Sequence, residues 1–365
     1  MFSSLIARKQ GVVCCTLAAV AACAIPLTAL AAEGRSPSAE SSPDPGVQKL
    51  AQEVADLGWL VFAGKSAQGD YDLFVCRPDG SKLCNITNTP QFNEFNARFS
   101  SDGKRLLYRR ITKVEHIDHT LHGQFGELVF SDSDGSNPVV QGKPGEFPWA
   151  SWNTDETQIA CLHKKEGKIR IFECETRKLV REMPSYGVFQ QLYWSPDGKR
   201  LCGVANVAGA DWNIIDIHLA TEKVTQLSRN LNCTPDYFHD SSWVIHSHRQ
   251  PGLADGYGWT MIMRATVDGK TRKLVYAERG KHVYWACTSP DDRYAIFSIF
   301  PQDGGIDGEM AVIRLADTPI VASSTVPYKE LEELHPNAKR GPVLRLTRVP
   351  AGFEPHWTSF RVDSK

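Results

Sequence analysis

Residues 192–206, LYWSPDGKRLCGVAN, contain two short apolar segments on either side of a polar turn. Leu192–Trp194 and Leu201–Ala205 are each predicted to form a strand. In the turn between them, SPDGK, proline presets φ and glycine tolerates a positive φ, as tight turns require. The stretch therefore predicts a β-hairpin.

The same hairpin pattern recurs along the chain. Its aspartates stand at positions 102, 155, 197, 240 and 291, a spacing of about 42 to 53 residues. The other copies, some of them degenerate, cover residues 97–109, 150–162, 237–246 and 286–299. A repeat of this length made only of strands is typical of a β-propeller with four strands per blade. We predict an all-β, six-bladed propeller.

The repeat also carries a family resemblance. Trp194-Ser-Pro-Asp-Gly-Lys-Arg200 followed by an apolar strand resembles the repeat of TolB-type, WD40-like propellers of the bacterial periplasm. The resemblance extends from about Trp59 to Trp357 and implies the fold. It does not specify the function, because propellers of this type serve as scaffolds, transporter partners and enzyme domains. The Trp-Asp dipeptide of eukaryotic WD40 blades is absent from the sequence. The segment before Trp59 is too short for the N-terminal α/β domain of TolB itself.

The N-terminal segment, residues 1–32, has the pattern of a secretory signal peptide. Arg8 and Lys9 precede an apolar run over 11–30, and Ala29-Leu30-Ala31 supplies small residues for cleavage. The alternative is a lipoprotein signal in which Cys23 is lipidated. We therefore expect a periplasmic or secreted protein, or a lipid-anchored one if Cys23 is modified.

The rest of the chain is predicted to divide into a tether and a propeller. Residues 33–57 begin Ser/Pro-rich and end in a short helix over 47–57. The propeller covers 58–365, and the strand predicted at 353–361 pairs into blade one and closes the ring.

Charge and motifs exclude several function classes. The 365 residues include 41 basic and 42 acidic side chains, a net charge of -1, so neither nucleic acid nor an acidic membrane surface is an expected partner. The sequence contains no G-x-S-x-G elbow, no phosphate-binding loop and no dinucleotide fingerprint. Nucleophilic and nucleotide-dependent catalysis have no motif to support them.

Seven cysteines follow the predicted signal peptide. Cys76 and Cys84 flank one predicted turn, and Cys161 and Cys174 flank another. In an oxidising compartment these spacings predict two cross-strand disulfides. The alternative is that each is an ordinary buried free cysteine.

Histidines form the candidate metal set. His116, His119 and His122 lie in a long insertion of blade two, and His239, His246, His248 and His282 lie in later blades. Oligogalacturonate lyases resemble this layout in placing metal-bound histidines on a propeller. The alternative is that the three histidines of the insertion are simply solvated, because their spacing is not that of a zinc motif.

Propeller geometry predicts a second candidate site. The Asp-Gly turns should gather at one mouth of the central channel, so the opposite mouth should be lined by the loops that enter each inner strand. Those loops carry Asn93, Glu94, Glu146, Gln190, Asp236, His282 and Glu354. Converging carboxylates there would hold a cation or a basic peptide; the alternative is that each is an ordinary polar loop residue.

Two functions remain from these observations. The first is a non-catalytic envelope scaffold for a protein or peptide, with contacts from the insertion at 110–127 and from Tyr257 and Trp259. The rival is a metal-dependent lyase or hydrolase acting on acidic oligosaccharides, for which His239, His246, His248 and His282 must converge. No cofactor is expected beyond a candidate cation in the channel, and a membrane is a partner only if Cys23 is lipidated.

Overall fold

The computed structural model describes residues 44–113, 126–207, 209–250, 259–278, 280–301, 308–322, 337–360 and 362. The chain divides into two compact units, Met1–Arg35 and Ser36–Lys365, and all described residues belong to the second. None of the helices in these ranges is long and apolar enough to cross a membrane. The predicted signal peptide and Cys23 lie outside the described residues.

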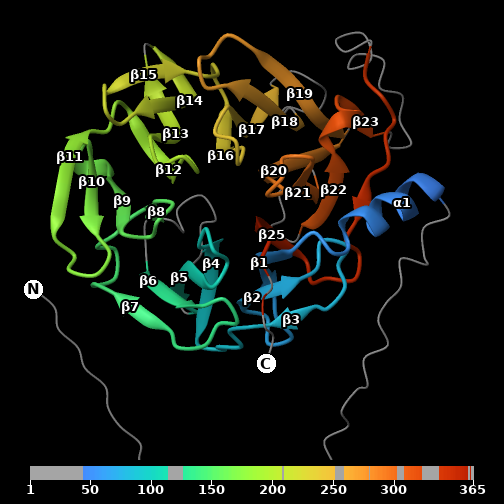
Figure 1. Cartoon of the computed structure of the whole chain (residues 1–365), viewed down its shortest axis with the longest axis horizontal. Helices are drawn as coiled ribbons and strands as arrows, with labels where there is room; N and C mark the ends of the chain where they lie inside the picture. Colours follow the sequence, from blue (N-terminus) through green and yellow to red (C-terminus); the bar gives the residue numbers. More distant parts are fainter. Residues whose placement is uncertain are drawn as a thin grey trace, which may run out of the picture. The chain divides into compact units, whose positions relative to one another are not determined.

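The described part of the second unit is a ring of β-sheets arranged around a central axis (Figure 1). Four sheets have four strands each. The first contains β25 (Gly352–Thr358), β1 (Trp59–Lys65), β2 (Tyr71–Cys76) and β3 (Cys84–Asn85). The second contains β4 (Phe92–Phe99), β5 (Arg105–Thr112), β6 (Glu127–Asp132) and β7 (Val139–Gln141). The third contains β8 (Ser151–Trp152), β9 (Gln158–His163), β10 (Lys168–Glu173) and β11 (Leu179–Pro184). The fourth contains β12 (Val188–Trp194), β13 (Arg200–Val207), β14 (Ala210–His218) and β15 (Lys223–Gln226).

The remaining strands form one nine-stranded sheet, so the predicted propeller is correct but the predicted count of six four-stranded blades is wrong. This sheet contains β16 (Asn232–Tyr237), β17 (Trp243–Gln250), β18 (Trp259–Thr266), β19 (Arg272–Glu278), β20 (Lys281–Thr288), β21 (Tyr294–Pro301), β22 (Glu309–Arg314), β23 (Ile320–Ala322) and β24 (Leu344–Arg345). Four blades are separate sheets. The last two antiparallel groups are fused, because Thr260 of β18 pairs in parallel with His282 of β20 and β19 pairs with β23.

The two ends of the ring meet in the first sheet. β25 pairs antiparallel with β1, with Leu60 opposite Trp357. Trp357 is 1% exposed, and its indole Nε1 donates to the carbonyl of Leu57 at 2.6 Å. The last described strand therefore forms the inner strand of a sheet whose other strands come from the beginning of the propeller, and it covers the edge of β1.

One turn type follows the inner strands. In the turn after β12, Ser195 Oγ donates to Asp197 at 2.5 Å, and the Lys199 N–H donates to the same carboxylate oxygen at 3.0 Å. Gly198 has a φ of 69°, the left-handed region that favours glycine. We call these connections the Asp-turns, and the end of the channel where they lie the Asp-turn mouth; their aspartates are Asp102, Asp155, Asp197, Asp240 and Asp291.

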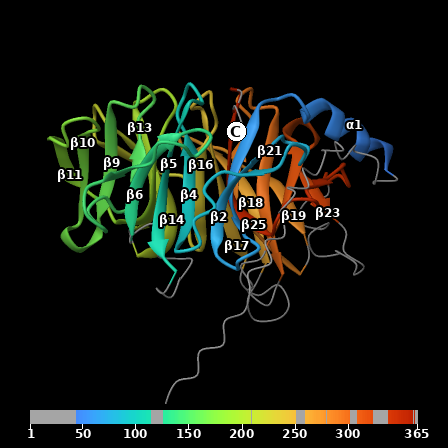
Figure 2. The ribbon, with the colours of Figure 1, turned by 90° about the horizontal axis from the view of Figure 1, so that it is seen from below.

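Seen from the side, the strands run between the two mouths of the ring, and α1 (Pro45–Val54) lies at its periphery (Figure 2). The helix buries Leu50, Ala51 and Val54 in a core shared with strands of the first and last sheets. Its Glu53 pairs with Arg314 of β22 at 2.5 Å. Two short 3₁₀ helices, Lys164–Glu166 and Leu315–Asp317, complete the described elements.

The cysteines show a second correction, since all seven in the described ranges are free. Cys84 lies opposite Val75, whereas Cys76 lies opposite Leu60. The predicted hairpin was thus one residue out of register, and a shift of one residue moves a side chain to the other face of a sheet. Cys161 lies opposite Arg170, and Cys174 follows the end of β10 rather than facing Cys161.

Candidate binding cavity at the Asp-turn mouth

A repeated backbone feature shapes the channel. Six non-glycine residues with φ between 49° and 57° lie in or just before the inner strands: Asn96, Trp149, Gln191, Thr234, Trp285 and Glu354. In five of these strands the pairing register shifts across this residue, as in a β-bulge. An advance of three residues along the inner strand is paired with an advance of two residues along its neighbour. A bulge re-aims the side chains that follow it. The residues two positions later all line one cavity: Arg98, Ser151, Tyr193, Asp236, Cys287 and His356.

The bulges are also bonded to one another around the ring. The Asn96 N–H donates to Glu354 Oε2 at 2.7 Å, and the Thr234 N–H donates to Gln191 Oε1 at 2.7 Å. The Trp285 N–H donates in turn to Thr234 Oγ1 at 3.2 Å. The side chain at one bulge thus satisfies a backbone donor at the next, which holds neighbouring inner strands in register.

The cavity has a volume of about 240 Å³ and opens at the Asp-turn mouth. Phe99, Trp152, Trp194 and Trp357 contribute aromatic lining. The turns at its rim are joined by hydrogen bonds: Ser101 Oγ donates to the Thr154 carbonyl at 2.6 Å, Thr154 Oγ1 to the Pro196 carbonyl, and the Asp197 N–H to Ser241 Oγ at 3.0 Å. Most of the rim is therefore a connected ring of turns.

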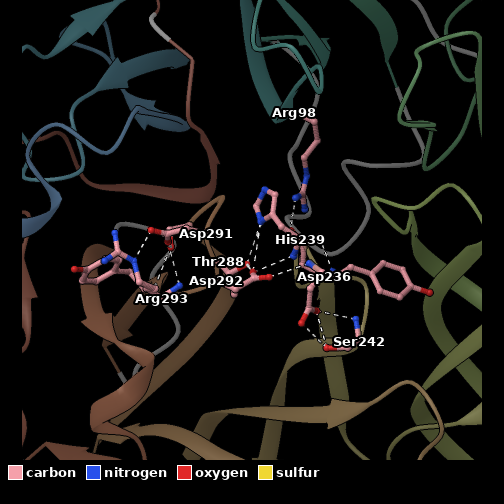
Figure 3. A network of polar contacts seen from close by, with 12 residues as sticks. Arg98, Asp236, His239, Ser242, Thr288, Asp291, Asp292 and Arg293 are labelled. Carbon is pink, nitrogen blue, oxygen red and sulfur yellow. Dashed lines mark hydrogen bonds and ion pairs between the residues drawn. The ribbon is translucent and has the colours of Figure 1, made fainter.

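Five residues, which we call the polar cluster, carry the chemistry of this cavity: Arg98, Asp236, His239, Thr288 and His356. Arg98 reaches from β4 toward Asp236 of β16, with 2.5 Å between Nη1 and Oδ2 (Figure 3). Both side chains are 15% exposed. The guanidinium also lies 4.3 Å from the centre of the Tyr193 ring. Burial disfavours the charged guanidinium, but the neighbouring Asp236 carboxylate more than offsets this and raises the pKa of Arg98.

His239 is held beside the ion pair by Asp292 and Thr288 (Figure 3). Its backbone N–H donates to Asp292 Oδ1 at 2.9 Å, and its Nδ1 lies 3.3 Å from Thr288 Oγ1. Thr288 Oγ1 donates to the same Asp292 oxygen at 2.6 Å. Burial raises the pKa of Asp292, but hydrogen bonds from His239, Thr288 and Asp240 outweigh it, so the pKa of this carboxyl is lowered.

His356 is a neutral hydrogen-bonding member of the polar cluster. Its burial, and the nearby positive charge of Arg98, hold the pKa of His356 well below its ordinary value. Its Nδ1 accepts a hydrogen bond from the Phe99 N–H at 3.1 Å. In a neutral imidazole that accepts at Nδ1, the hydrogen is on Nε2, so this side chain is a donor there.

The residues predicted for the opposite mouth do not gather into this cavity, with the exception of Asp236, which lies at the Asp-turn mouth instead. Asn93 accepts from the Tyr71 N–H at 2.9 Å, and Glu354 bonds to Asn96 as described. Exposed Glu146 accepts from the Lys143 N–H at 2.7 Å, while Gln190 is buried within β12. These groups are engaged on separate strands.

Glu94 has the most perturbed carboxyl of that predicted set. It is 1% exposed and accepts hydrogen bonds from Thr87 Oγ1 at 3.2 Å and from Thr89 Oγ1. Burial raises the pKa of Glu94 to about 8; the two threonines oppose the shift and the negative charge of Asp72 adds to it. Glu94 therefore carries a proton at neutral pH and is part of a buried hydrogen-bonded cluster.

The four candidate metal histidines that lie in the described ranges do not converge. His246 is 2% exposed on β17, and its burial lowers its pKa to about 3. His248 Nδ1 lies 3.1 Å from Asn232 Oδ1, and His282 Nδ1 lies 2.9 Å from Thr260 Oγ1. Of the four histidines that had to meet, His239 alone lines the cavity. Within the described ranges no three His, Cys, Asp or Glu side chains are grouped to hold a metal ion.

Several predicted contact residues lie outside the described part of the chain. His116, His119, His122 and Tyr257 are among them, and Trp259 begins β18 without a described side chain. Their roles in metal binding or partner contact, and a cation in the channel, stay predictions.

Sequence reasoning missed Arg98, Tyr193, Thr288 and His356 as cavity residues. A signal for most of them was present in the repeats. Arg98, Tyr193, Asp236 and Cys287 each stand four residues before the turn aspartate, and His356 precedes the matching aromatic Trp357. The repeat position four residues before the aspartate carries a positive, negative or neutral side chain, depending on the blade. The position that follows it is usually aromatic. Such a change of chemistry at one repeat position indicates a surface that differs from blade to blade.

Comparison with known proteins agrees with the fold. No protein-family model matches the sequence, and no curated protein matches it. The structure is similar to TolB from Acinetobacter baumannii, with a TM-score of 0.60 and 13% identity over 82% of this chain and 67% of that one. A structure assigned as TolB from Agrobacterium tumefaciens has a TM-score of 0.55 and 17% identity over 83% of this chain and 94% of that one. A protein in a nidogen–laminin complex has a TM-score of 0.51 and 10% identity over 71% of this chain and 89% of its own. The predicted TolB-like β-propeller is thereby confirmed as a fold.

Proposed function

We propose that this protein is a non-catalytic scaffold of the cell envelope that holds a protein or peptide partner at the Asp-turn mouth. The observation that carries the proposal is the cavity of about 240 Å³ with its aromatic lining, its polar cluster and its bonded rim. A preformed concave site with a few oriented polar groups is the usual form of a binding site. A rim held by inter-turn hydrogen bonds loses little conformational entropy when a partner binds.

The chemistry of the cavity favours binding over nucleophilic catalysis. Burial raises the pKa of the Cys287 thiol, and a thiol is a poor nucleophile until it is deprotonated. The Thr288 hydroxyl donates to Asp292, a carboxyl whose lowered pKa makes it a weak base. Arg98 and Asp236 neutralise one another. The described groups are therefore arranged to recognise a ligand by hydrogen bonds and aromatic contact.

Placement in the envelope is part of the proposal. It is supported by the signal-peptide pattern of residues 1–32 and by a fold similar to TolB. The N-terminus of the protein purified from cells, measured by mass spectrometry, tests it. Cleavage near Ala31 supports a periplasmic or secreted protein, a diacylated Cys23 supports the anchored form, and an intact leader in the cytoplasmic fraction contradicts both.

Site-specific photocrosslinking in cells tests the binding face. A photoreactive residue in place of Lys199, exposed in an Asp-turn, is expected to crosslink to a discrete partner. The matched control replaces Lys165, which is also exposed but lies in the connection between β9 and β10 at the other end of those strands. Crosslinks from Lys165 and not from Lys199 would move the binding face to the opposite mouth. No discrete product from either position would contradict the scaffold.

A further inference from the structure

The polar cluster has more hydrogen-bond donors than acceptors facing the cavity. Asp236, its carboxylate, accepts from Arg98 at Oδ2 and from the Tyr237 N–H at Oδ1, at 2.9 Å. Both of its oxygens are thus engaged. Arg98 has five N–H donors, of which one contacts Asp236 in this arrangement. The guanidinium therefore has N–H donors beyond the one that Asp236 occupies.

His356 adds a second donor beside Arg98. Its Nδ1 is occupied by the Phe99 N–H, which places its hydrogen on Nε2. Arg98, His239 and His356 all line the same cavity. Three nitrogen-bearing side chains therefore line one small space in which Asp236 is already paired with Arg98, while Asp292 beside it accepts from His239 and Thr288.

The cavity also fits the rest of a small acidic group. Its volume of about 240 Å³ equals roughly eight water molecules at ~30 Å³ each, enough for one side chain and little more. The aromatic residues Trp152, Trp194 and Trp357 lie along it and suit an apolar stem. A ligand with a charged tip and a short aliphatic stem matches both the polar cluster and the aromatic lining of the cavity.

We propose that the cavity binds a carboxylate group of the partner, which takes Arg98 from Asp236 and accepts a hydrogen bond from His356 Nε2. The carboxylate comes from a glutamate or aspartate side chain or from the free C-terminus of a polypeptide. This inference rests on the proposed function for the source of the ligand, because a partner at the Asp-turn mouth must supply it.

Titration of the purified protein with short peptides at pH 7 and low salt tests the proposal directly. The probes are Ac-Ala-Glu-Ala-NH₂, with an internal carboxylate, and Ac-Ala-Ala-Ala, with a free C-terminus. Ac-Ala-Gln-Ala-NH₂ and Ac-Ala-Lys-Ala-NH₂ are the neutral and basic controls. Tryptophan fluorescence reports binding, since three indoles line the cavity. We expect the glutamate or the C-terminal probe to bind at least about tenfold more tightly than the glutamine probe, the gain expected of charged hydrogen bonds.

Two substitutions are expected to act in opposite directions. Asp236→Asn removes the competing charge and should tighten binding of the acidic probe severalfold, whereas His356→Asn keeps an acceptor for the Phe99 N–H, removes the Nε2 donor and should weaken it severalfold. Arg98→Met should abolish binding of the acidic probe. If that variant does not fold, the Asp236→Asn and His356→Asn variants test the proposal. Arg170→Gln, on an outer strand, is the matched control and should change nothing.

Tighter binding of the lysine probe, or equal binding of the glutamate and glutamine probes, would overturn the proposal. The preferred acidic probe shows which source of carboxylate the cavity favours. Failure of the proposed scaffold function can be distinguished from failure of this proposal. In that case the crosslinks from Lys199 are missing, while the cavity still binds the acidic peptide.

Discussion

Arg98 of β4 and Asp236 of β16 form an ion pair at the channel, 138 residues apart in sequence and 2.5 Å apart in space. The pair joins the second four-stranded sheet to the nine-stranded sheet. Because both side chains are largely shielded from water, each relies on the other to offset its lost hydration. The same two residues are thus a structural contact and the centre of the candidate site.

Breaking this pair on one side should destabilise the protein. Arg98→Met leaves the Asp236 carboxylate shielded and uncompensated, and should lower the free energy of unfolding by about 2–4 kcal/mol. Adding Asp236→Leu should recover most of the loss. Urea unfolding followed by tryptophan fluorescence measures both variants. Arg170→Met, which breaks more exposed pairs with Glu166 and Glu182, is the control and should cost less than about 1 kcal/mol. Equal losses in the two single variants would contradict a buried pair.

Glu94 should make stability depend on pH. Its pKa, about 8 in the folded protein, is above the ordinary value of 4.5, so the folded state binds the proton more tightly. The resulting stability is fully present below about pH 4.5 and is lost as pH rises through about 8, an effect on the order of 5 kcal/mol.

Glu94→Gln tests this pH dependence, because an amide keeps an acceptor for Thr89 and can donate as the protonated acid does. The variant should be more stable than the parent at pH 8 and show a flatter profile between pH 5 and 8 in urea unfolding. Glu166→Gln, an exposed carboxyl, is the control and should leave the profile unchanged. A parent profile without this decline would contradict the assignment.

Removal of the C-terminal strand should unfold the propeller. Deleting residues 353–365 removes most of β25, its pairing with β1 and the buried Phe353 and Trp357. Loss of one buried Trp or Phe alone costs about 3–5 kcal/mol. Circular dichroism melting should show no cooperative transition near the parent temperature. The control deletes only 363–365, which leaves β25 intact. A 353–365 deletion that melts like the parent would exclude this closure.

The cysteines should be reduced and mostly inert in the folded protein. Burial raises the pKa of Cys174 and that of Cys233 to about 12, so few thiolates form at pH 8. Brief iodoacetamide treatment should therefore modify them little, while all seven thiols of the propeller should react after denaturation without reductant. Peptide mass mapping measures both. A Cys76–Cys84 or Cys161–Cys174 crosslink in that map would restore the predicted disulfides.

The hairpins of this protein were predictable because their determinants are local. Ser195, Asp197 and Gly198 act within one turn, and the same spacing at Ser289 and Asp291 gives the same bond, Ser289 Oγ to Asp291 at 2.6 Å. Once such hairpins recur at a regular spacing, stacking them around an axis is the way to bury their apolar faces. The propeller class followed from that repetition.

The cavity depended on contacts between distant blades. The bulges that turn Arg98, Asp236 and His356 toward one space are set by register shifts against neighbouring strands, and bulge positions have no short sequence signature here. Asp236 was recognised as a candidate, but its place in the channel was not, because one inserted residue changes the direction of the side chains after it.

The sequence by itself therefore determined the local elements of this protein: the strands, the Asp-turns and their repetition as a propeller, since these rest on interactions a few residues apart. Tertiary structure decided the number of separate sheets, through the pairing of Thr260 with His282. It also decided the cysteine register and the meeting of Arg98 with Asp236. The cysteine register is set by strand pairing within one hairpin, whereas the other two contacts join residues from different blades and form only when those blades have taken their places in the ring.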